Sequence, residues 1–165
     1  MNLFRHFCPV LTSQKLPAHS RMSTASSSSV TGGEKWFDKL PKPQSSPKSL
    51  GVDEQHSLLH DSSSDSVIVV DVRRTDIEDP MAFLISNAIN LPAQTFFHTL
   101  PAVIPLFQRY SHVVFHCSSS QGRGPRCAAW YEDALVERKL PVNAYVLSGG
   151  IKAWASKYRD EVVPV

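Results

Sequence analysis

The chain has 165 residues, of which 42% are hydrophobic and 19% are charged, and its formal net charge is +2. This length and apolar content suit one domain, while the small charge excess gives no sign of a nucleic-acid partner and no apolar run reaches the roughly 18 residues that span a membrane. Three cysteines, Cys8, Cys117 and Cys127, form neither a disulfide framework nor a metal-ligand spacing, which favours an intracellular protein.

The first 33 residues contain no acid, several basic residues and a serine-rich run from Ser23 to Ser29. This composition is typical of a mitochondrial presequence and equally typical of a disordered tail. We therefore expect residues 1–34 to be a flexible leader or presequence, followed by a domain over residues 35–165 with its core in 50–158. The compartment is left open between the mitochondrion and the cytoplasm or nucleus.

The next segments predict an arm, a helix and a strand. Trp36 and Phe37 are too apolar for a free linker, and the prolines and serines after them prevent a helix, so we expect an extended arm packed on the domain. Val52 to His60 has helical spacing. The apolar run Val67 to Val72 is typical of a strand covered on both faces in a parallel sheet.

The second half alternates helices and strands. Residues 74–87 are irregular, and the elements expected after them are a helix over Leu100 to Tyr110, a strand over Val113 to Phe115, a helix from about Cys127 to Arg138, a strand over Ala144 to Leu147, and a helix from Ile151. With right-handed crossovers, this order predicts an α/β domain in which helices flank a parallel sheet.

The loop between the Val113 strand and the next helix carries the chemistry. Cys117 ends the strand, five small or flexible residues follow, and Arg123-Gly124-Pro125 leads into the helix. Small side chains and Gly122 let successive amides turn toward one anion, and the helix N-terminus adds partial positive charge. These surroundings favour the thiolate of Cys117. The loop predicts a nucleophile in an oxyanion-binding site.

Two roles follow for the loop residues. Cys117 is the candidate nucleophile, and Arg123 is the second catalytic candidate because its planar guanidinium can hold two oxygens of a tetrahedral anion. The residues between them complete the predicted substrate-binding set, which is Ser118, Ser119, Ser120, Gln121, Gly122 and Arg123.

The pattern H-C-x(5)-R-G-P-R resembles the rhodanese-fold phosphatases of the M-phase inducer type and the rhodanese-like arsenate reductases of fungi and plants. Three more segments are similar in sequence and order: residues 69–73 (VVDVR), 88–93 (AINLPA) and 147–154 (LSGGIKAW). In this family five residues between cysteine and arginine suit phosphate or arsenate, whereas sulfurtransferases use four. The resemblance implies a single rhodanese-like domain, in which Asp71, Arg73 and His116 support the loop structurally.

The resemblance implies a cysteine-dependent phosphatase, of the protein tyrosine or dual-specificity type, that forms a phosphocysteine intermediate on a phosphorylated protein. An arsenate reductase acting on a small oxyanion, with glutathione or glutaredoxin as electron donor, is not separated from it by sequence. A thiosulfate sulfurtransferase with a Cys117 persulfide and a non-catalytic phosphate-binding module are disfavoured by the loop length and by the intact Cys117 and Arg123. We expect no cofactor, metal, nucleic-acid or membrane partner, and a monomer.

Two departures from the M-phase inducer pattern affect the mechanism. The loop contains no acid, so the proton for the leaving group has to come from the substrate, from water, or from Asp76, Glu78 or Asp79. The second cysteine that protects the nucleophile in those phosphatases is replaced by Val72. Cys127 is expected to face the sheet as a small hydrophobe, with a resolving role as the alternative.

Overall fold

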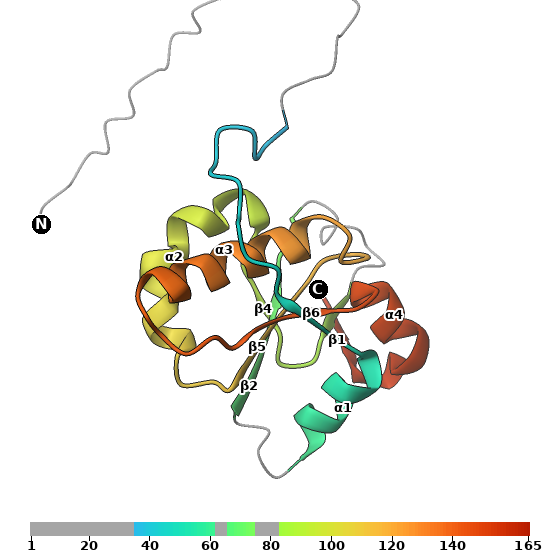
Figure 1. Cartoon of the computed structure of the whole chain (residues 1–165). Helices are drawn as coiled ribbons and strands as arrows, with labels where there is room; N and C mark the ends of the chain where they lie inside the picture. Colours follow the sequence, from blue (N-terminus) through green and yellow to red (C-terminus); the bar gives the residue numbers. More distant parts are fainter. Residues whose placement is uncertain (1–34, 62–65, 75–82) are drawn as a thin grey trace, which may run out of the picture. The chain divides into compact units, whose positions relative to one another are not determined.

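A five-stranded parallel sheet forms the centre of the domain (Figure 1). The computed structural model describes residues 35–61, 66–74 and 83–165. Across the sheet the strands lie in the order β1 (Lys48–Leu50), β6 (Ala144–Leu147), β5 (His112–His116), β2 (Val67–Asp71) and β4 (Ile89–Asn90), and all neighbours are parallel. The predicted leader lies outside the described residues.

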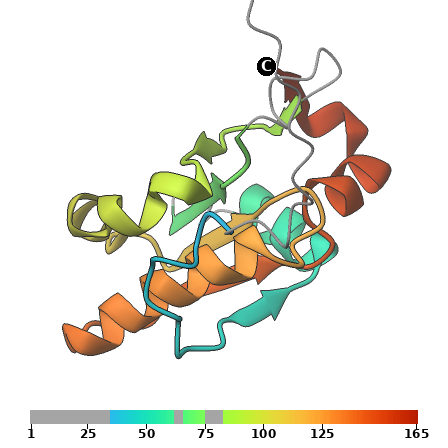
Figure 2. The same ribbon diagram turned by 90° about the horizontal axis from the view of Figure 1, so that it is seen from above.

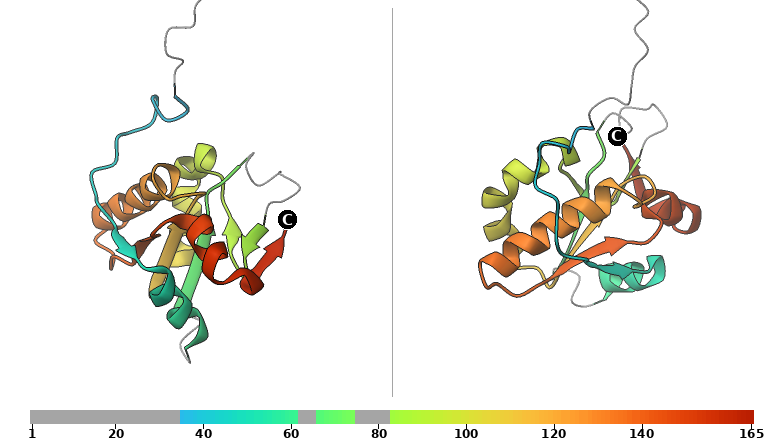
Figure 3. Two further views of the ribbon diagram at one scale, coloured as in Figure 1. Left: turned by 90° about the vertical axis from the view of Figure 1, so that its right-hand side faces the viewer. Right: turned by 45° about the horizontal axis from the view of Figure 1, so that its top comes forward.

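Helices cover both faces of the sheet. On one face lie α2 (Ala93–Phe107) and α3 (Arg123–Glu137), and on the other α1 (Val52–His60) and α4 (Gly150–Lys157), as Figure 1 and the left view of Figure 3 show. Strand β5 shows how side chains alternate between the two cores, because Val113 and Phe115 pack under α2 and α3 while Val114 packs on the opposite face. The predicted parallel α/β fold is confirmed.

Helix α2 begins earlier and ends earlier than its sequence predicts. The expected helix was Leu100 to Tyr110, but the structure places Ala93–Phe107 in one helix with Pro101 and Pro105 inside it. An internal proline removes a backbone hydrogen bond and costs about 3 kcal/mol. Several large apolar side chains on one face of α2 are buried, each contributing about 1.5–3 kcal/mol, which outweighs that cost; they are Phe96, Leu100, Val103, Ile104 and Phe107.

A second, antiparallel sheet was not predicted. Strands β3 (Phe83–Ile85) and β7 (Val162–Pro164) pair with each other. The 3-10 helix η3 (Arg159–Glu161) precedes β7, and the amide of Ser86 donates to the Glu161 carbonyl at 2.9 Å. Each strand has three residues, which is too short for a periodic pattern to be visible in the sequence.

The arm before β1 lies along α3, as Figure 2 and the right view of Figure 3 show. The ring of Trp36 meets Trp130 of α3 edge to face, with centroids 6.0 Å apart. The backbone amides of residues 44 and 45 each donate to one carboxylate oxygen of Asp133, both at 2.8 Å. The predicted packing of the arm on the domain is therefore confirmed. Within the described residues, no helix has the length and apolar character needed to cross a membrane.

Candidate active site

The predicted nucleophile lies where β5 meets α3. Strand β5 ends at His116, and α3 begins at Arg123, so the intervening loop occupies the carboxyl edge of the parallel sheet. Pro125 lies in the first turn of α3, where a missing amide removes no intrahelical bond. The Cys117 side chain is 4% exposed. Cys117 thus lies beside the positive end of a 15-residue helix.

Helix α4 fixes the loop through two backbone hydrogen bonds. The amide of Ile151 donates to the carbonyl of Cys117 at 3.0 Å, and the amide of Lys152 donates to the carbonyl of Ser118 at 3.1 Å. Both carbonyl oxygens therefore accept hydrogen bonds from α4 and do not point toward a bound anion. The segment 147–154, which the sequence marks only as a sharp turn and a core tryptophan, therefore also fixes the conformation of the loop.

The loop turns tightly enough for its serine hydroxyl to reach the amide of the cysteine. Ser120 has φ +52°, and its hydroxyl accepts a hydrogen bond from the Cys117 amide at 3.4 Å. Gly124 packs closely against this turn, because a β-carbon there would lie 3.3 Å from the Ser120 hydroxyl. In the described part of the chain, the amides of Ser119, Gln121 and Gly122 donate to no acceptor. These amides are available to an oxyanion.

A cavity of about 400 Å³ opens over the cysteine. We call it the cup; its lining residues are Trp36, Phe37, Cys117, Ser118, Ser119, Gly122, Arg123 and Arg126. One guanidinium nitrogen of Arg123 lies 3.4 Å from the Ser118 hydroxyl. Of the predicted binding residues, Ser120 and Gln121 line a neighbouring cavity of about 470 Å³ instead. The hydroxyl, amide and guanidinium groups around the thiol donate hydrogen bonds, which suits them to bind an anion.

The arm supplies one wall of the cup, which sequence reasoning missed. Trp36 and Phe37 meet edge to face with centroids 5.3 Å apart. The guanidinium carbon of Arg126 lies 3.6 Å from the centre of the Phe37 ring, a close cation–π contact. The indole of Trp130 donates to the Pro41 carbonyl at 2.8 Å and so fastens the arm behind this wall. Two features of the sequence could have indicated this wall: the aromatic pair in the arm, and Arg126, the second arginine of the R-G-P-R motif.

Asp71 and Arg73 form a buried ion pair at the end of β2. Arg73 donates to both carboxylate oxygens of Asp71 and to the Phe83 carbonyl, the shortest contacts being 2.6 Å. Both side chains are engaged with the protein and neither lines the cup, and the support of the loop that the resemblance implies for them stays a prediction. His116 is fully buried, and this burial lowers its pKa below the ordinary value. The lowered pKa favours the neutral form of His116, which lies next to Cys117 in the chain.

Comparison with known proteins gives the family. Residues 52–157 match the sequence profile of the rhodanese-like domain. This chain belongs to the rhodanese-like family. The match contains the whole of the loop from Cys117 to Arg123 and the supporting segment at α4, whereas the aromatic wall of the cup, Trp36 and Phe37, lies before the matched range.

Named relatives of this rhodanese-like domain include enzymes. The dual specificity phosphatase ibp1 of Schizosaccharomyces pombe is 26% identical over 113 residues, which cover 58% of this chain and 80% of that protein. The solved As-Sb reductase of Leishmania major is 26% identical with a TM-score of 0.57, covering 69% and 80% of the two chains. The yeast protein Ygr203w, a protein tyrosine phosphatase of the rhodanese family, is 25% identical with a TM-score of 0.56, covering 72% and 90%.

Cys127 faces the interior of the rhodanese-like domain. It lies on α3, is fully buried and packs in the core beneath α2 and α3. Burial raises the pKa of the Cys127 thiol far above its usual range, and the neighbouring Cys117 is a second, smaller cause of the rise. The structure thus places Cys127 as a small hydrophobe, and both Cys117 and Cys127 are free thiols.

The source of the leaving-group proton stays a prediction. The acids proposed for it, Asp76, Glu78 and Asp79, lie outside the described residues. Among the described residues that line the cup, none is acidic.

Proposed function

We propose that this rhodanese-like domain is a cysteine-dependent phosphatase. The observation that carries the proposal is the position of Cys117 at the N-terminus of α3, in a cup shared with Arg123 and with loop amides that have no acceptor within the described chain. Positive charge from the helix end and the arginine favours a thiolate and a bound oxyanion together. A phosphorylated protein is the expected substrate, as the named phosphatase relatives suggest.

The cup supports an in-line displacement at phosphorus. The Cys117 sulfur forms the S–P bond while the P–O bond to the leaving group breaks, and the departing oxygen takes up a proton. Arg123 and the loop amides bind the equatorial oxygens, whose charge they stabilise through the transition state. Water then attacks the phosphocysteine, giving inorganic phosphate and returning the thiolate.

The wall formed by Trp36 and Phe37 favours a substrate with an aromatic leaving group. A volume of about 400 Å³ lies in the range of pockets that hold small organic ligands and exceeds what a lone oxyanion needs. Aromatic side chains beside the nucleophile offer surface to a flat ring. Aryl phosphates, including phosphotyrosine, therefore fit the cup better than a bare oxyanion does.

An arsenate reductase is the second candidate, and the similarity to the As-Sb reductase favours it. The same thiolate would attack arsenate and release water, forming an arseno-cysteine. Two thiols from outside the chain, as in glutathione with glutaredoxin, would then supply two electrons and leave as a disulfide while arsenite is released. Arsenate needs the loop and Arg123 but makes no use of the aromatic wall.

Parallel assays separate these chemistries. Purified protein is given p-nitrophenyl phosphate, then arsenate with glutathione and glutaredoxin, then thiosulfate with cyanide. We expect turnover of the phosphate ester, and its loss in Cys117→Ser with binding of inorganic phosphate retained. Reduction of arsenate with no ester hydrolysis would contradict the phosphatase proposal in favour of the reductase. Turnover of thiosulfate alone would contradict both proposals and indicate a sulfurtransferase.

A further inference from the structure

Two histidines and a glutamate from distant parts of the chain meet on the face covered by α1 and α4. His56 and His60 lie one turn apart on α1, with ring centroids 4.2 Å apart. Glu161 belongs to η3, and its Oε1 lies 2.8 Å from His56 Nε2 and 3.4 Å from His60 Nε2. One carboxylate oxygen therefore faces both imidazole nitrogens.

The hydrogen bonding of His60 prepares its ring to bind a metal. Its Nδ1 lies 2.9 Å from the backbone carbonyl oxygen of His56. A carbonyl oxygen only accepts, so Nδ1 carries the proton of the neutral ring and Nε2 keeps its lone pair. A histidine whose second nitrogen donates to a backbone carbonyl is the common arrangement at metal centres. The free Nε2 of His60 is the atom that faces Glu161.

One separation matches tetrahedral coordination, and a second needs only a small adjustment. Ligand atoms bound at 2.0–2.1 Å to a tetrahedral Zn²⁺ lie about 3.3 Å apart. The distance between His60 Nε2 and Glu161 Oε1 is 3.4 Å, and the three ligand atoms all lie within 4.8 Å of one another. The contact between His56 and Glu161, at 2.8 Å, is a hydrogen bond that has to open by about 0.5 Å as the metal replaces the shared proton.

Neighbouring groups fix the site before any metal binds. The His56 ring is stacked between His60 and Tyr158, whose ring centroid is 3.9 Å away. The Tyr158 hydroxyl donates to Asp53 at 2.6 Å, which holds that ring in turn. The side chains of His56, His60 and Glu161 are 28%, 54% and 29% exposed, so water can reach the remaining coordination position.

We propose that His56, His60 and Glu161 bind a divalent transition metal, and that Zn²⁺ suits this set of two imidazoles and one carboxylate best. A bound metal joins α1 to the C-terminal segment, which are 105 residues apart, and so stabilises the folded domain. The spacing H-x(3)-H was visible in the sequence, but Glu161 is brought to it only by the fold. None of the three residues lines the cup, so the inference is independent of the proposed activity.

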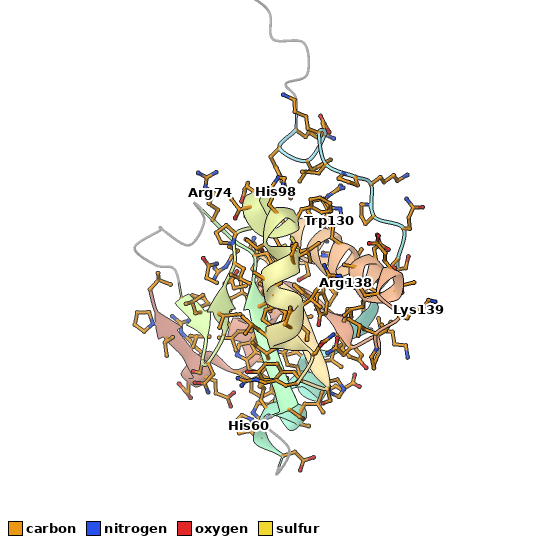
Figure 4. The ribbon with its side chains drawn as sticks, turned by 90° about the vertical axis from the view of Figure 1, so that its left-hand side faces the viewer. His60, Arg74, His98, Trp130, Arg138 and Lys139 are labelled. Atoms are coloured by element: carbon orange, nitrogen blue, oxygen red, sulfur yellow. The ribbon has the colours of Figure 1, made fainter. Side chains whose placement is uncertain are left out.

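Zinc titration of the full-length, tag-free chain tests the site. The Cys117→Ser background is used throughout, because a thiolate in the cup also binds zinc. The test variants are His60→Ala and Glu161→Gln, and His98→Ala is the matched control because it removes an exposed histidine of α2. Figure 4 labels His60 and His98 at opposite ends of the domain.

We expect calorimetry to show one zinc site fewer in His60→Ala, at least tenfold weaker binding in Glu161→Gln, and no change in His98→Ala. The thermal midpoint of the parent and of His98→Ala should rise with zinc more than that of either test variant. Equal zinc binding in the parent and His60→Ala would overturn the proposal. The contacts of Glu161 with the two histidines would then join α1 to the C-terminal segment without a metal. If His60→Ala does not fold, Glu161→Gln decides by the same two measurements.

Discussion

A β-carbon on Gly150 would lie 2.3 Å from the carbonyl oxygen of Cys117 and 2.8 Å from that of Ser118. Gly150 also has φ +61°, a conformation that L side chains rarely adopt. Both the space and the backbone therefore require glycine at the start of α4. The close approach is what lets the amides of Ile151 and Lys152 reach the loop that carries the nucleophile.

Gly150→Ala should damage the cup more than the fold. The left-handed backbone conformation costs a residue with a β-carbon about 1–2 kcal/mol, which we expect as the loss of unfolding free energy. The contact with two backbone carbonyls cannot be relieved by a rotamer change, so the loop has to shift, and we expect turnover of p-nitrophenyl phosphate to fall at least tenfold. Chemical denaturation and steady-state kinetics measure the two effects.

Gly51→Ala is the matched control for that substitution. Gly51 has φ −70°, and a β-carbon there meets nothing within 4 Å. Stability and turnover should both stay at the parental level. Parental turnover in Gly150→Ala would show that α4 does not set the conformation of the loop.

Arg123→Lys should reduce turnover of p-nitrophenyl phosphate by one or more orders of magnitude. Lysine keeps the charge but loses the planar fork, and an oriented contact to a developing oxyanion is often worth about 3 kcal/mol. Arg138→Lys at the other end of α3, labelled in Figure 4, is the control and should leave the rate unchanged. A rate within twofold of the parent for Arg123→Lys would mean that this side chain does not contact the transferred group.

The loop was predictable because its chemistry lies in consecutive residues. Cys117 and Arg123 are separated by one short segment between a strand and a helix, so local spacing is enough to propose an anion site at a helix N-terminus. The bounds of α1 and β6 also match their predictions, because each is a short, strongly patterned run.

The features that sequence reasoning missed depend on contacts between distant segments. Trp36 and Phe37 were expected on the surface of the domain, but their place in the wall of the cup depends on contacts of the arm with Trp130 and Asp133 of α3. Helix α2 continues through two prolines because of burial against the sheet, which local propensity does not contain. Strands β3 and β7 are too short to carry a pattern and form only because they pair.

Trp36→Ala should raise the KM for p-nitrophenyl phosphate by roughly two- to tenfold, as expected for the loss of about 0.5–1.5 kcal/mol of aromatic contact. Inhibition by inorganic phosphate should not change, because phosphate occupies the loop and not the aromatic wall. Trp36→Phe keeps an aromatic ring in the wall and should lie near the parent. Equal increases in KM and in the phosphate inhibition constant would indicate a displaced loop instead of a lost aromatic subsite.

Iodoacetamide should modify Cys117 much faster than Cys127. Cys117 lines an open cup, whereas burial raises the pKa of Cys127 and keeps it as an unreactive thiol. Inorganic phosphate should slow the labelling of Cys117 by occupying the cup. Peptide mapping by mass spectrometry reports each cysteine separately. Equal labelling of both, with no protection by phosphate, would be incompatible with the site.

His116 should make the folded state less stable in mild acid. Burial lowers the pKa of His116 from 6.5, an effect that nearby Asp71 opposes and Arg73 reinforces. Below pH 6.5 the unfolded chain therefore binds a proton that the folded chain does not, so the free energy of unfolding falls as the pH drops, by up to about 1.4 kcal/mol per pH unit for one group. His116→Gln removes this contribution, and urea denaturation between pH 7 and pH 5 should give a shallower slope. His98→Ala is the exposed-histidine control and should keep the parental slope; an unchanged slope in His116→Gln would mean that His116 takes up a proton in the folded state.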